Sequence, residues 1–206
     1  MGHVVEVLPR LGKNKREIGE VLNLNKMFKQ LYESLTEKEK EIFNYYKNSS
    51  YELNEALFKN EVSEFLERIN ELDLLIQKDE NSNQITLYRA TDDAWLKDFI
   101  EGKTNIIKTF LSTCNNLNSV ERHFSGIQFC NPTIMIINCP IGTKMISLDS
   151  DLFGVSENEI LLGREHLFVI VKNEIIQDSN QIEKYMGKFY AKGIEKFRVL
   201  ELNLIS

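Results

Sequence analysis

The stretch Ser156-Glu157-Asn158-Glu159-Ile160-Leu161-Leu162-Gly163-Arg164 predicts a short apolar strand that opens on two acidic residues. Side chains two residues apart share one face of a strand, so Glu157 and Glu159 point the same way, about 7 Å apart. Two carboxylates this close disfavour joint ionisation, an arrangement that suits acid–base chemistry or the binding of a cationic or hydroxyl-rich substrate. A solvated strand face is the alternative interpretation of this pair taken alone.

Two earlier apolar segments also end in polar side chains. Arg89 follows Ile85-Thr86-Leu87-Tyr88, which places a guanidinium at the end of a strand beside the core. Its planar fork suits phosphate or carboxylate recognition, although a surface arginine on an edge strand has the same pattern. Phe110-Leu111-Ser112-Thr113-Cys114 ends a second strand in small hydroxyl residues, which either hydrogen-bond a ligand or begin a turn or helix cap.

The hydrophobic period changes from helical to strand-like along the chain. Apolar residues recur at helical spacing from Leu24 to Leu75, where Thr36 and Glu39 form a capping box and Asn48-Ser49-Ser50 predicts a break. This pattern indicates about four short helices. Seven strand-like runs follow, namely Ile85–Arg89, Ile106–Leu111, Thr133–Asn138, Lys144–Leu148, Glu159–Leu162, Leu167–Val171 and Phe197–Ile205.

Three further helices are predicted among the strands, near Asp92–Glu101, Ser119–Phe124 and Gln181–Phe189. Because helices come first and strands follow without βαβ alternation, this order favours an α+β fold with a mostly antiparallel sheet. Short helices with single apolar stripes need a partner surface. We therefore predict one folding unit, with an N-terminal helical part over residues 1–80 packed on a β-rich core over residues 81–206.

The composition is that of a globular protein and excludes several classes of function. The 206 residues are 42% hydrophobic and 27% charged, with a formal net charge of −6, so nucleic acid is not expected as a main partner. Cys114, Cys130 and Cys139 lack metal-site spacing and the histidines are scattered, so we expect neither a disulfide framework nor a metal. No apolar run approaches the roughly 20 residues of a membrane span, and no signal peptide is visible. We expect a cytoplasmic protein without membrane partners.

In this order, Tyr88-Arg89, Ser112-Thr113-Cys114 and Glu157-Asn158-Glu159 resemble the motifs of the mono-ADP-ribosyltransferases of the Arg-Ser-Glu group. That family has an Arg on its first core strand, a Ser-Thr-Ser triplet on the second and a Glu or Gln two residues before a Glu on a later one. The spacings, about two dozen and about forty-five residues, also fit. Leu35–Glu41, followed by Tyr46, Ser50, Tyr51 and Asn54, is similar to the N-terminal helices of binary-toxin and tailed-phage members, so the resemblance covers roughly Leu35–Val171. It implies two packed, mostly antiparallel sheets with N-terminal helices.

The resemblance also implies NAD as co-substrate and gives each site residue a role. Arg89 anchors the pyrophosphate, and Glu159 accepts a hydrogen bond from the ribose 2′-hydroxyl and stabilises the positive charge that develops as nicotinamide leaves. Ser112 holds the Glu159 carboxylate, and Thr113 lies beside it in the NAD site. Glu157 meets the acceptor. A glutamate there, where asparagine-modifying members carry glutamine, indicates an acceptor arginine on a target protein.

Several interpretations remain open. Leu148–Ser156 is the expected target-contacting loop, and Phe153 at its centre either contacts the target or packs in the ordinary way. Cys114 replaces a hydroxyl of the family triplet, and a thiol is a weak donor and acceptor, so Ser112 is kept as the functional serine. Two alternatives to arginine transfer are an NAD glycohydrolase, in which water is the acceptor, and an inactive member of the fold that binds a protein.

Overall fold

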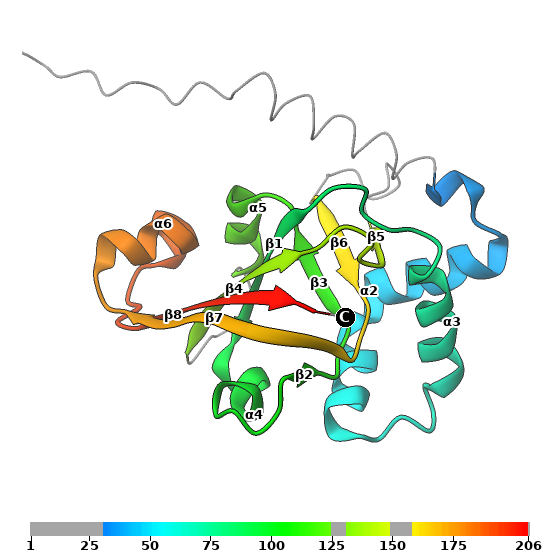
Figure 1. Cartoon of the computed structure of the whole chain (residues 1–206), viewed down its shortest axis with the longest axis horizontal. Coiled ribbons are helices and arrows are strands. Elements are labelled where there is room, and N and C mark those ends of the chain that lie inside the picture. The colour runs from blue at the N-terminus through cyan, green and yellow to red at the C-terminus, as the bar shows by residue number, and fades with distance from the viewer. Residues whose placement is uncertain (1–30, 125–130, 149–157, 206) are drawn as a thin grey trace, which may run out of the picture.

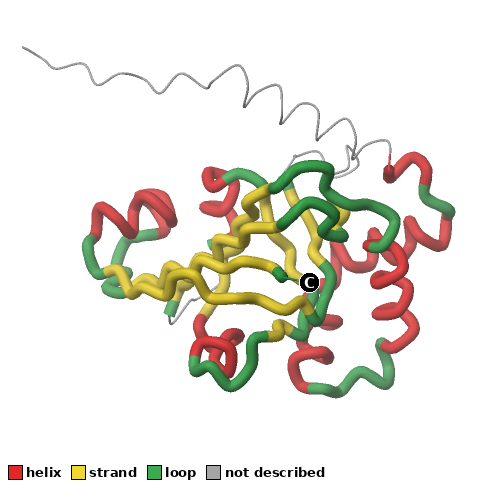
Figure 2. The backbone as a smooth tube through the Cα atoms, viewed as in Figure 1, coloured by secondary structure: helices red, strands yellow, loops and turns green. Residues whose placement is uncertain are grey.

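The computed structural model describes residues 31–124, 131–148 and 158–205, which form an α+β fold (Figure 1). The helices are α2 (Glu37–Lys59), α3 (Leu66–Ile76), the 3₁₀ helix η1 (Asp93–Leu96), α4 (Lys97–Ile100), α5 (Leu117–His123) and α6 (Ser179–Tyr190). The strands are β1 (Ile85–Asp92), β2 (Ile106–Ile107), β3 (Leu111–Cys114), β4 (Pro132–Cys139), β5 (Met145–Ser147), β6 (Glu159–Leu162), β7 (His166–Ile176) and β8 (Phe197–Leu204). Strands occupy the middle of the molecule, with α2 and α3 at one end and α6 at the other (Figure 2).

The N-terminal helices agree with the sequence pattern wherever the described chain covers them. Residues 31–34 are helical, and α2 begins after Thr36, whose Oγ1 accepts a hydrogen bond from Glu39 N at 3.3 Å. Glu39 Oε2 accepts one from Thr36 N at 2.9 Å, so the predicted capping box is confirmed. The predicted break is a kink inside α2, where Ser49 departs from helical geometry at φ −135° and ψ 29°. The kink divides α2 into two shorter helical pieces.

The predicted strands are present, with one split. Ile106–Leu111 is not a single strand, because pairing stops after Ile107 and resumes at Leu111. Between them, Phe110 is fully buried and its amide donates to Asn54 Oδ1 at 3.0 Å. A side chain therefore satisfies this backbone donor in place of a neighbouring strand. The Ser112 triplet forms the last three residues of β3, so the predicted strand that ends in this triplet is present.

The expectation of two packed sheets is wrong, because the strands form one mixed sheet. Its order is β2-β7-β8-β4-β1-β3-β6-β5. All neighbouring strands run antiparallel except β4 and β8, which are parallel, so the mostly antiparallel character is confirmed. The join between the two halves is β1–β3, where a single residue pair, Tyr88↔Cys114, is in register. This one pair makes the two halves continuous.

The sheet must curl strongly at this join. Strands β2 and β3 are first and sixth in the sheet, about 24 Å apart if it were flat at about 4.8 Å per strand. Yet β2 ends at Ile107 and β3 starts at Leu111, a connection that spans at most about 14 Å when fully extended. The turn from Leu162 to His166 joins β6 and β7 in the same way. Both connections are possible only because the halves fold toward each other.

Three buried clusters accompany this curl. The first takes residues from all eight strands and includes Leu87, Leu111, Leu162 and Leu200. The second packs α2 and α3 on the β3–β6–β5 half through residues such as Phe43, Leu72, Phe110, Ile146 and Leu161. The third packs α5 and α6 on the other half through residues such as Val120, Ile182, Ile134 and Val199. The helical part therefore contacts the strands directly, whereas the division at residue 80 stays a prediction. None of the helices in the described ranges is long and apolar enough to cross a membrane.

The capping box gives the first prediction. Thr36→Ala removes the acceptor for Glu39 N and should lower the free energy of unfolding by about 1 kcal/mol. Thr36→Ser keeps a hydroxyl at the cap and is the matched control, with less than half of that loss. Urea unfolding followed by circular dichroism measures both variants. Equal stability of Thr36→Ala and the parent protein would show that the cap does not contribute.

Candidate active site

Arg89 lies within β1, half-buried, and reaches across the join of the sheet to β3. Its Nη1 donates a hydrogen bond to the carbonyl oxygen of Ser112 at 2.7 Å. Burial lowers the pKa of the guanidinium, while Tyr46 and Glu159 act in the opposite direction, and an arginine stays charged under such shifts. Among the described residues, Arg89 forms no ion pair. The guanidinium is thus held in place by a neutral carbonyl, without a carboxylate partner in the described part of the chain.

Ser112 links β3 to helix α2 through a chain of hydrogen bonds. Its Oγ lies 3.2 Å from the hydroxyl of Tyr46, and Asn54 Nδ2 donates to the same hydroxyl at 3.3 Å. The Asn54 side chain also accepts from Phe110 N, so one asparagine fixes both the helix and the start of β3. Burial raises the pKa of Tyr46, which keeps the phenol neutral. The Ser112 hydroxyl is therefore oriented by α2.

Glu159 is the first residue of β6 and is only 7% exposed. It lies opposite Cys114 in the β3–β6 register, while Ser112 lies opposite Leu161, so the serine and the glutamate share one face of this half. The carboxylate forms an ion pair with Lys47 of α2. Its backbone oxygen accepts from Leu148 N at 3.0 Å, which anchors the start of β6. The motif glutamate is thus a buried, paired charge.

The expected Ser112–Glu159 hydrogen bond is not among the contacts of these two described residues. The serine hydroxyl binds Tyr46, and the carboxylate binds Lys47. Both side chains are positioned by adjacent residues of one helix. Roles for Ser112 and Glu159 in a reaction remain proposals, whereas their convergence with Arg89 is a feature of the fold.

Thr113 and Cys114 are placed differently from Ser112. Thr113 is 1% exposed and its Oγ1 donates to the carbonyl of Ile160 at 2.7 Å, on the face of β3 opposite to Ser112. The hydroxyl therefore serves the β3–β6 pair. The thiol of Cys114 is buried and lies 3.5 Å from the Tyr88 carbonyl oxygen and 3.4 Å from that of Asn116. Cys114 shares the face of Ser112 and lies opposite Glu159, so the triplet presents its serine and a buried, neutral thiol on that face.

Two of the predicted site residues, Glu157 and Phe153, lie outside the described residues, as does most of the predicted target-contacting loop. The described chain resumes at Asn158, whose backbone has a left-handed conformation with φ 53°. Its Nδ2 lies 3.2 Å from Ser119 Oγ at α5, and its carbonyl accepts from Asn115 N at 3.4 Å. These contacts fix the entry into β6 one residue before Glu159.

Sequence reasoning did not assign Tyr46, Lys47 and Asn54 to the site, although the structure places all three there. They belong to an amphipathic helix whose apolar residues form its core face. The available signal was a polar stripe on the same helix: Lys47 and Asn54 are two turns apart and follow the buried Phe43. Such a stripe beside a core face indicates polar groups that need partners in the strands beneath.

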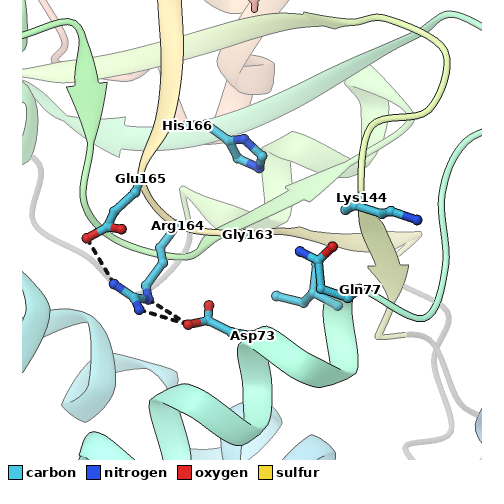
Figure 3. Close-up of a pocket in the computed structure, with 8 residues that line it drawn as sticks. Asp73, Gln77, Lys144, Gly163, Arg164, Glu165 and His166 are labelled. Atoms are coloured by element: carbon cyan, nitrogen blue, oxygen red, sulfur yellow. Dashed lines mark hydrogen bonds and ion pairs between the residues drawn. The ribbon is translucent and has the colours of Figure 1, made fainter. Parts of the chain in front are cut away.

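A separate cavity of about 300 Å³ lies between the end of α3 and the turn from β6 to β7 (Figure 3). Arg164 Nε and Nη2 lie 2.9 and 2.8 Å from Asp73 Oδ2, and its Nη1 lies 2.9 Å from Glu165. The lining also includes Lys144, which pairs with Glu80 outside the cavity. Of the predicted site residues that the structure describes, none lines this cavity. Arg164 pairs with Asp73 and Glu165 and so ties α3 to the turn, and we assign the cavity a structural role.

The sequence from residue 24 to residue 191 matches the family described as ADP-ribosyltransferase exoenzyme. Among solved structures, C3stau2 from S. aureus with NAD has a TM-score of 0.64 at 16% identity, covering 92% of this chain and 96% of that chain. Plx2a, an ADP-ribosyltransferase toxin from Paenibacillus larvae, has a TM-score of 0.63 at 17% identity, covering 91% and 96%. BECa of C. perfringens, an ADP-ribosylating toxin solved with NADH, has a TM-score of 0.63 at 18% identity, covering 90% of this chain and 48% of that one. A comparison with curated proteins found no match.

The fold is therefore that of the bacterial ADP-ribosylating toxins. The family match extends over most of the chain and includes Arg89, Ser112 and Glu159. The protein belongs to the ADP-ribosyltransferase exoenzyme family, and the resemblance seen in its sequence motifs is confirmed.

The buried thiols give the second prediction. Burial raises the pKa of Cys114 and of Cys139 to about 12 each, and only the thiolate reacts readily. At pH 8, iodoacetamide should label neither residue in the native protein and both in denaturant, as measured by peptide mass spectrometry. Native labelling of Cys114 would show a reactive thiol beside Ser112. Because a neutral, buried thiol is not a nucleophile of the reaction, Cys114→Ser should keep enzymatic activity.

Proposed function

We propose that the protein transfers ADP-ribose from NAD to an arginine side chain of a target protein and releases nicotinamide. The observation that carries this proposal is the convergence of Arg89, Ser112 and Glu159 on adjacent strands of a chain that belongs to the ADP-ribosyltransferase exoenzyme family. Two proteins of the same fold were solved with NAD and with NADH, which supports a dinucleotide site. The proposed setting is the cytosol of the cell that contains the target.

Arg89 fits the diphosphate of NAD. Its guanidinium is held at one nitrogen by the Ser112 carbonyl and has no carboxylate partner among the described residues. A half-buried, uncompensated cation is stabilised by an anionic ligand, and the planar fork can bind two phosphate oxygens at once. Thr113 was expected in the NAD site, but its hydroxyl binds the Ile160 carbonyl. We propose that Thr113 supports the site only through the β3–β6 pair.

Glu159 supplies negative charge near the bond that breaks. As nicotinamide leaves, positive charge develops on the ribose, and a fixed carboxylate in a site with little water stabilises it more than solvent would. At 7% exposed, Glu159 is in such an environment. The Ser112 hydroxyl, on the same face of β3 and β6, is proposed to bind the ribose or the carboxylate once NAD is present.

Arginine is proposed as the acceptor on the basis of Glu157. A carboxylate two residues before Glu159 can bind a guanidinium and help to remove its proton. Vis, with a TM-score of 0.60 at 16% identity, was solved with agmatine, a small molecule that carries a guanidinium as arginine does. Phe153 is proposed to contact the target in the loop before Glu157. No metal enters this scheme.

Arg89 gives the third prediction. Arg89→Ala should weaken NAD binding by about 2 to 3 kcal/mol, because a charge-assisted contact is lost, and Arg89→Lys should recover only part of this. Arg68→Ala is the matched control, since this exposed guanidinium lies over the Tyr45 ring, 4.2 Å from its centroid. Titration calorimetry measures all three variants. Unchanged affinity of Arg89→Ala would remove Arg89 from the NAD site.

The two motif glutamates give the fourth prediction. Glu159→Gln should abolish nicotinamide release and ADP-ribose transfer together, at a cost of several kcal/mol in the barrier. Glu157→Gln should retain most nicotinamide release but lose transfer to arginine, because only the acceptor loses its partner. Nicotinamide release and label incorporated from NAD into a target lysate are measured side by side.

The outcomes separate the candidate functions. Nicotinamide release by the parent protein without label in any protein would favour an NAD glycohydrolase. Neither activity in the parent protein would favour an inactive protein-binding member of the fold. Full arginine transfer by Glu157→Gln would contradict the acceptor role of Glu157, and label mapped to asparagine would contradict the arginine specificity.

A further inference from the structure

The ion pair between Lys47 and Glu159 joins the helical part of the protein to the catalytic strand. Lys47 Nζ contacts Glu159 Oε2, and the exposed fractions of the two side chains are only 12% and 10%. The partners are far apart in the sequence, on α2 and β6. A pair this deeply buried is weakly screened by solvent, so it fixes both side chains.

Two cations of the described chain lie near Glu159, and their contacts differ. Among the described residues, the groups that face or influence the carboxylate include Lys47 and Tyr46 from α2, Arg89 from β1 and Cys114 from β3. Of these described groups, Lys47 forms an ion pair with it, whereas Arg89 donates to the Ser112 carbonyl. The thiol of Cys114 and the phenol of Tyr46 are kept neutral by burial. The lysine therefore holds the carboxylate in place, and Arg89 stays available.

The position of Lys47 is imposed by the contacts of its helix. Tyr46, one residue earlier, binds the Ser112 hydroxyl, and Asn54, two turns later, binds the Phe110 amide. The kink at Ser49 lies between these two anchors. Lys47 thus projects from a segment that is fixed at both ends against β3, and its ammonium reaches β6 from there.

We infer that Lys47 is a positioning residue of the reaction, which pairs with the Glu159 carboxylate and orients it, so that Arg89 remains available for the diphosphate. This inference rests on the proposed function, because it assigns Lys47 a role only through Glu159. It also makes α2 part of the active site. Without Lys47, the carboxylate loses the ion pair that sets its direction, while Arg89, whose charge it also favours, is still close by.

The test compares Lys47→Met, a neutral side chain of similar length, with Lys47→Arg. Lys47→Met should lower kcat for nicotinamide release by about 100-fold, because a misplaced group costs the transition state more than substrate binding. KM for NAD should change by less than about threefold. Lys47→Arg keeps the charge and should remain within about tenfold of the parent kcat. A purely structural role of Lys47 would not lower kcat while leaving KM nearly unchanged, and it would not predict that Lys47→Arg retains activity.

A control variant and a folding check show whether a loss of activity is specific to Lys47. Lys59→Met, on the exposed part of α2 where Lys59 pairs with Glu55, should leave kcat unchanged. Circular dichroism checks that each variant folds. If Lys47→Met does not fold, Lys47→Gln, which keeps a polar group without charge, replaces it with the same expected loss.

Two results would overturn the role of Lys47. One is a folded Lys47→Met or Lys47→Gln variant with kcat within threefold of the parent. The other is a loss of kcat in Lys47→Arg equal to that of the neutral variant. If, in either case, the parent protein transfers label from NAD to arginine and Glu159→Gln does not, the proposed function stands and only the inference about Lys47 has failed. Absence of nicotinamide release from the parent protein would instead contradict the proposed function.

Discussion

The rest of the structure depends on the join between β1 and β3, where only Tyr88 and Cys114 are in register. A single pair allows the strands to diverge and the eight-stranded sheet to curl, which the two short connections between its halves require. Arg89 is next to this pair in β1, and Ser112 is two residues from it in β3. The hydrogen bond from Arg89 to the Ser112 carbonyl therefore spans the join. The site lies where the sheet changes direction.

Helix α2 has two roles that its sequence combines on one surface. Its apolar residues pack on the β3–β6–β5 half, and its polar residues reach the same strands between them. Buried polar groups are stable only when they are paired, so Tyr46, Lys47 and Asn54 must meet partners in the strands. This pairing sets the position of the helix. The helical part thus positions Ser112 and Glu159 through a hydrogen bond and an ion pair as well as through packing.

The charges of the site follow one pattern. The single described carboxylate of the motif is paired with a lysine, and the motif arginine is bound to a neutral carbonyl. An opposite arrangement, with Arg89 on Glu159, would leave neither group available for a dinucleotide. Since buried charges strongly favour paired states, a third charged residue is the simplest means of keeping the arginine free. Lys47 therefore affects both charged residues of the proposed site: it contacts Glu159 directly and leaves Arg89 available.

The sequence by itself determined the local elements and the motif. Helical spacing gave the N-terminal helices, Thr36 and Glu39 gave the start of α2, and apolar runs gave the strands, because these signals depend on residues near one another in the chain. The order Arg89, Ser112, Glu159 gave the family, since a motif needs only residue types and spacing. Tertiary structure alone decided that one curled sheet replaces two, that Thr113 faces away from Ser112, and that Lys47 meets Glu159. Each of these depends on contacts between distant segments, and the side chains that meet there are selected by how the strands and α2 pack together.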